Sequence, residues 1–215
     1  MVTAGGITIA LPRGAQLGSS LDLLDRLGID TRPIRENDRR LIFPELGVIT
    51  TRPSDVPTYV EHGAADIGIT GKDVLLEQDD REVYELLDLG YGYCRMIVAA
   101  RDGDDPLGEP LRRRGSVRIA TKYPRIASGY FTGTGRAAEI VEVKGSVEIG
   151  PLTGLVDAIV DLTASGRTLT ENHLVEIEQI VECTARVIAN PVAHKLKAVA
   201  MDELVGRMRD ASGAQ

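Results

Sequence analysis

The segment 157–169 has the residue types of a phosphate-binding loop. An apolar strand leads into a loop of small and hydroxyl-bearing residues and then into the start of a helix. Gly166 allows the backbone to approach a ligand closely, and Thr163, Ser165 and Thr168 carry hydroxyl donors. The segment has neither the Gly-Lys-Ser/Thr ending of a Walker A loop nor three spaced glycines. It predicts an anion site, with an ordinary strand-to-helix turn as the alternative interpretation.

Two carboxylates belong to the same strand. Asp157 and Asp161 are four residues apart, so on a strand they share a face at about 13 Å from each other, too far to bind one ion together. Each could instead contact ribose hydroxyls or a magnesium-bound pyrophosphate. An aspartate that only caps a backbone turn is the alternative for both.

Positive charge also falls at loop positions. Six cations there could serve phosphate-bearing ligands: Arg13, Arg52, Lys72, Arg95, Lys122 and Arg167. The run 112–114 is a denser basic cluster, but its place between Pro110 and Gly115 favours a solvated turn. The three histidines, at 62, 173 and 194, form no metal-ligand spacing and are interpreted as structural or surface residues. No residue is assigned as a catalytic acid or base, and no protein metal ligand is assigned.

The bulk properties exclude several classes of protein. A net charge of -7 over 215 residues argues against a protein that coats nucleic acid. No apolar run approaches the roughly 20 residues that span a bilayer, and residues 1–9 lack the features of a signal peptide. Cys94 and Cys183 have no metal-like spacing, which favours free thiols in a reducing cytoplasm.

The order of elements is that of a duplicated α/β protein. Residues 6–11 and 117–120 are each a strand followed by a loop and a helix, and a glycine stands three residues before an aspartate at both 63–66 and 154–157. We predict two similar α/β lobes with a central cleft, joined by two crossings. Lobe I comprises residues 1–91 and 171–215, lobe II comprises 92–170, and the strand-like runs 174–177 and 185–189 are expected to return to lobe I.

Seven blocks in order resemble those of the ATP phosphoribosyltransferase family, which opens histidine biosynthesis by joining ATP to 5-phosphoribosyl-1-pyrophosphate (PRPP). They are Leu11-Pro12-Arg13-Gly14 and residues 52–56, 66–73, 87–92, 119–124, 145–148 and 157–169. The resemblance covers about residues 7–197 and implies two lobes like those of type II periplasmic binding proteins. The chain departs from the family at Ala15, where a basic residue is usual, and at Asn172-His173, where Asn-Gly is common.

The resemblance also implies site residues and partners. PRPP would be held by Asp157 and the loop 163–168, with a further set of expected contacts in and near it: Asp161, Thr163, Ala164, Ser165, Gly166, Arg167, Thr168 and, more weakly, Glu148. The adenine nucleotide would meet Asp73 and Tyr123, together with the basic residues Arg13, Arg52 and Lys72. Since the chain stops at Gln215, it resembles the family's short form, which works with Mg2+ in a hetero-octamer with a regulatory subunit related to histidyl-tRNA synthetase.

The expected reaction transfers the 5-phosphoribosyl group of PRPP to N1 of ATP. Adenine N1 carries a lone pair near neutral pH, so no side chain must activate it, and catalysis would depend on positioning and charge. Two other functions remain open from the sequence: a phosphoribosyltransferase for another base, and a two-lobed ligand-binding module.

Overall fold

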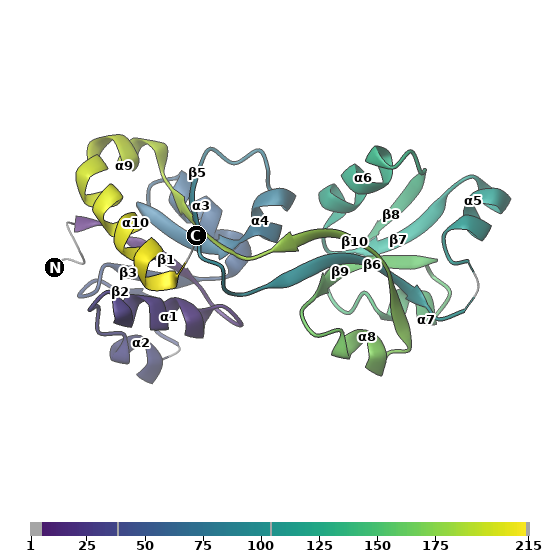
Figure 1. The fold of residues 1–215 in the computed structure, drawn as a ribbon, viewed down its shortest axis with the longest axis horizontal. Helices are drawn as coiled ribbons and strands as arrows, with labels where there is room; N and C mark the ends of the chain where they lie inside the picture. The colour runs from purple at the N-terminus through teal and green to yellow at the C-terminus, as the bar shows by residue number, and fades with distance from the viewer. Residues whose placement is uncertain (1–5, 38, 104, 214–215) are drawn as a thin grey trace. The chain divides into compact units, whose positions relative to one another are not determined.

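The chain divides into two compact units, each with its own sheet (Figure 1). The computed structural model describes residues 6–37, 39–103 and 105–213. Unit 1 comprises residues 1–93 and 184–215, and unit 2 comprises 94–183. The predicted boundary at 170 was wrong, because β10 (Leu174–Cys183) pairs along its length with β6 (Cys94–Arg101) in the unit 2 sheet. The run 174–177 therefore does not return to unit 1.

The unit 1 sheet contains parallel strands with an antiparallel side. Its order is β2-β3-β1-β4-β11-β5. The parallel strands are β1 (Ile9–Pro12), β3 (Val48–Thr51) and β4 (Ile67–Gly71). The antiparallel strand β11 (Ala185–Ala189) lies between β4 and β5 (Tyr84–Asp88), and β2 (Ile42–Phe43) pairs antiparallel with β3.

Apart from a short 3-10 helix, the helices described in unit 1 bury apolar side chains. They are α1 (Leu17–Arg26), α2 (Arg32–Glu36), the 3-10 helix η2 (Pro53–Asp55), α3 (Val56–Glu61), α4 (Lys72–Glu77), α9 (Pro191–Leu196) and α10 (Ala198–Ser212). In α1, Leu21, Leu23 and Leu24 are buried, and Gly28 follows the helix with a φ of +83°. Such a left-handed position is common just past a helix end and favours glycine. Helix α10 packs beside α1 (Figure 1).

The sequence after Pro191 predicts one amphipathic helix with Leu196, Val199, Leu204 and Met208 on one face, whereas the chain there forms α9 and α10. Asn190 caps α9, because its Oδ1 accepts the N–H groups of Val192 and Ala193, and α10 begins separately at Ala198. Leu204 and Met208 are buried as predicted, but Leu196 and Val199 are 79% and 84% exposed. Leu196 ends α9 before the break, and Val199 lies nine residues before Met208 in α10, which places it on the opposite side of that helix.

The unit 2 sheet has the order β10-β6-β9-β7-β8. Strands β7 (Val117–Thr121), β8 (Ala138–Glu142) and β9 (Ala158–Thr163) are parallel, whereas β6 is antiparallel to both of its neighbours. Helices α5 (Gly108–Arg114) and α6 (Pro124–Gly133) pack on one face, and α7 (Ile149–Leu152) and α8 (Arg167–Glu171) on the other (Figure 1). The basic run 112–114 thus ends α5 instead of forming a turn.

Both units repeat the same connection between parallel strands. Asp66 precedes β4 and accepts the N–H of Thr8, just before β1, at 2.7 Å. Asp157 precedes β9 and accepts the N–H of Arg118, in β7, at the same distance. Each aspartate follows a glycine with a φ of +73°, at Gly63 and Gly154. The duplication predicted from the glycine-aspartate spacing is therefore present, and both aspartates hold the amino ends of their strands.

His173, which stands where glycine is common in the family, has an unusual backbone conformation. His173 has a φ of +55°, the only positive φ of a non-glycine residue in the described parts of the chain. It ends the turn between α8 and β10. Glycine adopts this conformation without the side-chain penalty that histidine incurs, so the Asn-Gly pair common in the family suits this turn.

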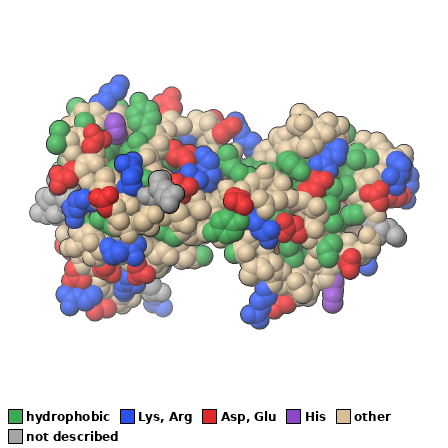
Figure 2. Space-filling view, in the orientation of Figure 1, with side chains coloured by type: hydrophobic (Ala, Val, Ile, Leu, Met, Phe, Trp, Pro, Cys, Tyr) green, Lys and Arg blue, Asp and Glu red, His purple; other side chains and the backbone are tan. Residues whose placement is uncertain are grey.

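The surface carries mixed charge. On the face that Figure 2 shows, Lys and Arg side chains are interspersed with Asp and Glu instead of forming one basic patch. Within the described residues, no helix is both long and apolar enough to cross a membrane.

Candidate functional site

Most of the candidate site residues of unit 2, for PRPP or for ATP, follow the carboxyl ends of its parallel strands. Lys122 and Tyr123 follow β7, Glu148 lies beyond β8, and the loop 163–166 follows β9. Because the three strands are parallel, these ends meet at one edge of the sheet. The structure therefore places Asp161, Glu148 and the loop at the same edge as Lys122 and Tyr123, which are distant from them in sequence.

The loop contains a left-handed turn at its centre. Gly166 has a φ of +75° and stands at the N-cap of α8, and its N–H donates to Thr163 Oγ1 at 3.0 Å. A Cβ added at Gly166 would meet no atom within 4 Å. Thr163 is buried, whereas Ala164, Ser165 and Thr168 are exposed. In the described part of the chain no hydrogen bond engages the Thr168 hydroxyl, so it is available to a ligand.

The guanidinium of Arg167 is not directed toward the loop. Its Nε donates to Glu171 Oε1 at 2.7 Å, one turn further along α8, and its side chain is 82% exposed. The Arg167 guanidinium therefore lies on the solvent side of a short helix. Only the backbone N–H of Arg167, which is 3.4 Å from Ser165 Oγ, belongs to the loop.

Asp161 lies in β9 two residues before the end of the strand. Its side chain is only 13% exposed; Oδ1 accepts the N–H of Leu162 at 2.9 Å, and Oδ2 is 3.6 Å from Lys122 Nζ. Burial raises the pKa of Asp161, the charge of Lys122 lowers it, and the charge of Glu148 raises it again. Two carboxylates and one ammonium thus interact beside the loop.

Asp157, in contrast, does not reach the loop. It lies at the amino end of β9, and its carboxylate binds Arg114 Nη2 as well as the Arg118 N–H. The strand between it and the loop has six residues, which span about 20 Å. The structure gives Asp157 the same position as Asp66 in unit 1, which is held by Lys197 Nζ at 2.8 Å. The contacts of Asp157 hold neighbouring parts of unit 2 together, and we do not place this residue at PRPP.

Four of the five predicted nucleotide residues meet at the equivalent edge of the unit 1 sheet. Arg13 follows β1, Arg52 follows β3, and Lys72 and Asp73 follow β4. The Arg13 N–H donates to Thr51 O at 2.7 Å, which fixes the first two turns against each other. Tyr123, the fifth, belongs to unit 2, where it precedes α6 and donates its N–H to Thr121 Oγ1.

Two of these side chains are already engaged. Lys72 Nζ binds Glu85 Oε2, in β5, at 2.7 Å, and no local sequence pattern indicates this partner. Asp73 is 8% exposed and folds over Gly71, where an added Cβ would come within 2.0 Å of Asp73 Oδ1. Gly71 therefore leaves the space that the Asp73 carboxylate occupies.

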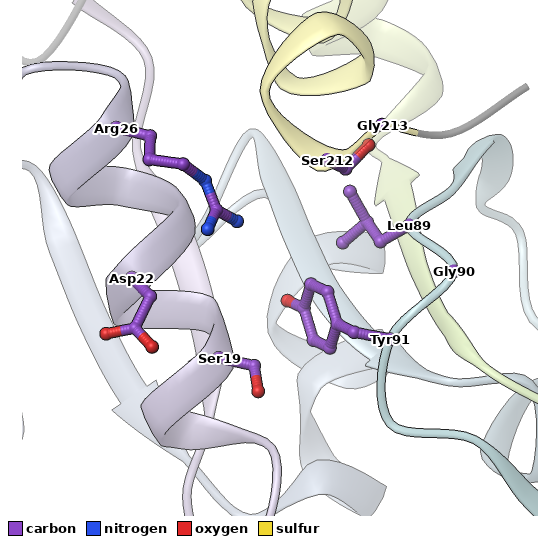
Figure 3. A pocket seen from close by; sticks show the side chains of 8 residues that line it. All are labelled: Ser19, Asp22, Arg26, Leu89, Gly90, Tyr91, Ser212 and Gly213. Carbon is purple, nitrogen blue, oxygen red and sulfur yellow. The ribbon is translucent and has the colours of Figure 1, made fainter.

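A pocket of about 370 Å3 lies elsewhere in unit 1. Figure 3 shows Arg26 and Tyr91 directed into it between α1 and the end of α10. Its full lining is Ser19, Asp22, Arg26, Leu89, Gly90, Tyr91, Ser212 and Gly213. The Tyr91 hydroxyl is 2.9 Å from Ser20 Oγ, and burial raises the pKa of Tyr91 to about 12. No residue predicted to bind PRPP or ATP lines this pocket, so it is separate from both strand edges.

Two α/β units, each with loops at the carboxyl edge of parallel strands, make a fold like that of type II periplasmic binding proteins. The fold agrees with that of the alkanesulfonate-binding protein SsuA from Xanthomonas axonopodis pv. citri, which has a TM-score of 0.58 over 95% of this chain and 72% of its own, at 12% identity. That similarity concerns the fold alone.

Closer comparisons show the family. The family model described as ATP phosphoribosyltransferase (HisG) matches residues 52–210. A protein named ATP phosphoribosyltransferase from Desulfitobacterium hafniense (strain Y51) is 43% identical over 216 residues, 96% of each chain. A chain of the ATP phosphoribosyl transferase (HisG:HisZ) complex from Thermotoga maritima has a TM-score of 0.81 and 31% identity, over 96% of this chain and 98% of that one. The protein belongs to the ATP phosphoribosyltransferase family, and so is a transferase of the first step of histidine biosynthesis.

Proposed function

We propose that the loop 163–168 holds the 5-phosphate of PRPP during transfer of the phosphoribosyl group to N1 of ATP. The main support for the proposal is Gly166. Its left-handed backbone turns the chain just after β9, and the space beside its Cα is empty. Backbone N–H groups of Ala164, Ser165 and Arg167 and the Thr168 hydroxyl are the donors nearest that space in sequence. Phosphate oxygens accept such donors readily.

The charges beside the loop suit the rest of PRPP. Asp161 and Glu148 can accept hydrogen bonds from ribose hydroxyls, and Lys122 can meet a pyrophosphate oxygen once PRPP competes with Asp161 for it. Carboxylate and phosphate oxygens are the ligands that Mg2+ prefers, so Asp161 fits as one protein ligand of a magnesium ion carried by PRPP. When bound, that ion would neutralise charge on the departing pyrophosphate.

The unit 1 edge is assigned to ATP. Arg13, Arg52 and Lys72 offer cations to the triphosphate, and Asp73 and Tyr123 are assigned to the adenosine part. Lys72 must then share its charge between the nucleotide and Glu85. None of these side chains has to remove a proton from N1, because its lone pair attacks directly; their contribution is to hold N1 in line with the ribose carbon that bears pyrophosphate.

The reaction is tested by mixing the purified full chain with ATP, PRPP and Mg2+, alone and together with a regulatory subunit. We expect pyrophosphate release and a new ultraviolet absorbance from the N1-substituted adenine. Guanine and pyrimidine nucleotides serve as controls for the base. If ATP yields no pyrophosphate under either condition, the assignment of this reaction to the chain fails.

The partner and the compartment belong to the same proposal. The similar chain from Thermotoga maritima was solved in a HisG:HisZ complex, and we propose that this chain likewise works with a regulatory subunit, in a hetero-octamer. Cys94 and Cys183 form no disulfide in this structure, which is compatible with a reducing cytoplasm.

Replacing Asp161 by asparagine is expected to stabilise the fold while weakening PRPP binding. The folded-state pKa of Asp161 is raised, mainly by burial, so its contribution to stability is full below about pH 4 and is lost as the pH rises through the folded pKa. At pH 7 the variant has no carboxylate charge to bury at position 161, so its melting temperature should exceed that of the parent. The difference should shrink as the pH falls, and PRPP affinity should drop about 10-fold or more. Thermal unfolding at several pH values and calorimetry measure both, and a variant that melts lower at pH 7 contradicts the argument.

A further inference from the structure

The two cysteines of the chain face each other across neighbouring strands. Cys94 begins β6 and Cys183 ends β10, and the two residues are Cα partners in the antiparallel ladder. Partners in such a ladder lie about 4.5–5.5 Å apart at Cα. That separation falls within the range of about 4.4–6.8 Å found for disulfides. Neither cysteine is in a disulfide in this structure.

Their place in the fold is equally specific. Cys94 and Cys183 are the first and last residues of unit 2, so they stand where the chain enters and leaves it. The next residue of β6, Arg95, is the Cα partner of Thr163, with which the phosphate loop begins. A disulfide between Cys94 and Cys183 would therefore join the two ends of unit 2. It would lie one residue from Arg95, the strand partner of Thr163.

The two thiols differ in access. Cys94 is partly exposed, whereas Cys183 is 1% exposed. A thiol must be reached by the oxidant and lose its proton to react. The accessible Cys94 is thus the residue that attacks first, and the shielded Cys183 is positioned to complete the exchange.

We propose that Cys94 and Cys183 form a reversible disulfide with small-molecule disulfides of the glutathione class. The Cys94 thiolate attacks one sulfur of the oxidant, breaking its S–S bond and releasing one thiol. Cys183 then gives its proton to the departing group as its sulfur attacks Cys94, and the second thiol leaves. Two protein thiols are oxidised and one external disulfide is reduced to two thiols.

The test uses the purified full chain in glutathione buffers of increasing oxidised fraction, followed by alkylation and mass spectrometry. Both thiols should be lost together, with the mass lower by two hydrogens and no glutathione attached. The oxidised chain should melt about 10 °C higher, because the bond closes the whole of unit 2, and dithiothreitol should reverse the shift. Retention of two alkylatable thiols in fully oxidised glutathione, or covalent dimers, would overturn the proposal.

Single serine variants separate the two roles. Cys183→Ser should stop at a mixed disulfide between glutathione and Cys94, without a rise in melting temperature. Cys94→Ser should keep an unmodified thiol at Cys183 until the chain is unfolded. A Cys94→Ser variant that is modified as fast as the parent contradicts the proposed order, and a parent that accumulates the mixed disulfide shows that the pair does not close.

Discussion

Replacing Gly166 by valine is expected to reduce PRPP affinity at least about 100-fold, while the fold is retained. The Gly166 backbone has a φ of +75°, which a β-branched residue adopts at a cost of roughly 1–2 kcal/mol. Open space around the added Cβ means that no protein atom must move. The branched side chain would instead fill the space proposed for the phosphate. Calorimetric titration with PRPP measures the loss, which corresponds to about 2.7 kcal/mol.

Gly154 provides a matched control in the same unit. It has nearly the same φ, +73°, and equally open surroundings, but it precedes the amino end of β9 instead of the loop. Gly154→Val should lower the melting temperature as much as Gly166→Val and leave PRPP binding intact. If both variants bind PRPP equally well, the loop is a structural turn and the phosphate lies elsewhere.

Replacing Asp157 by asparagine is expected to lower stability without changing PRPP binding. Its side chain is 12% exposed and accepts from Arg114 and from the Arg118 N–H. Asparagine keeps one oxygen for the N–H but removes the charge that holds Arg114, a loss of roughly 1.5–3 kcal/mol for a hydrogen bond to a charged group. In a chain of this size each kcal/mol lowers the melting temperature by about 2–4 °C.

Asp161→Asn is the contrasting variant, on the same strand. The two substitutions should have opposite effects on the melting temperature at pH 7, and only Asp161→Asn should weaken PRPP. Asp66→Asn in unit 1 should resemble Asp157→Asn, because both aspartates hold a neighbouring strand through its N–H. A clear rise in the KM for PRPP in Asp157→Asn would return that residue to the binding site.

Local patterns were enough to predict most of the elements. Hydrophobic spacing gave α1 and the buried β7, and the Gly-x-x-Asp pattern gave the duplication, because each depends on neighbours in sequence. The loop at 163–168 and the cations after β1, β3 and β4 were predicted as site residues from local patterns as well, and the structure places them after strands whose ends share an edge.

The features that could not be predicted from the sequence depend on contacts between residues far apart along the chain. Two aspartates four residues apart look equivalent, yet Arg114 and Arg118 make Asp157 a strand connection. The Lys72–Glu85 pair and the assignment of β10 to unit 2 depend on strand order in the same way. The start of α9 depends on Asn190, whose side chain accepts the N–H groups of Val192 and Ala193 and so acts as a helix cap.

The position of β11 has a consequence for synthesis of the chain. This strand lies between β4 and β5, but it is translated after the whole of residues 94–183. Until it emerges from the ribosome, β4 and β5 each lack a neighbour and their edges stay open. Unit 2 is contiguous and has all of its strands earlier, so it can complete its sheet first. The amino-terminal part of the nascent chain must therefore wait for the carboxyl-terminal part, and it is the part most dependent on protection from aggregation meanwhile.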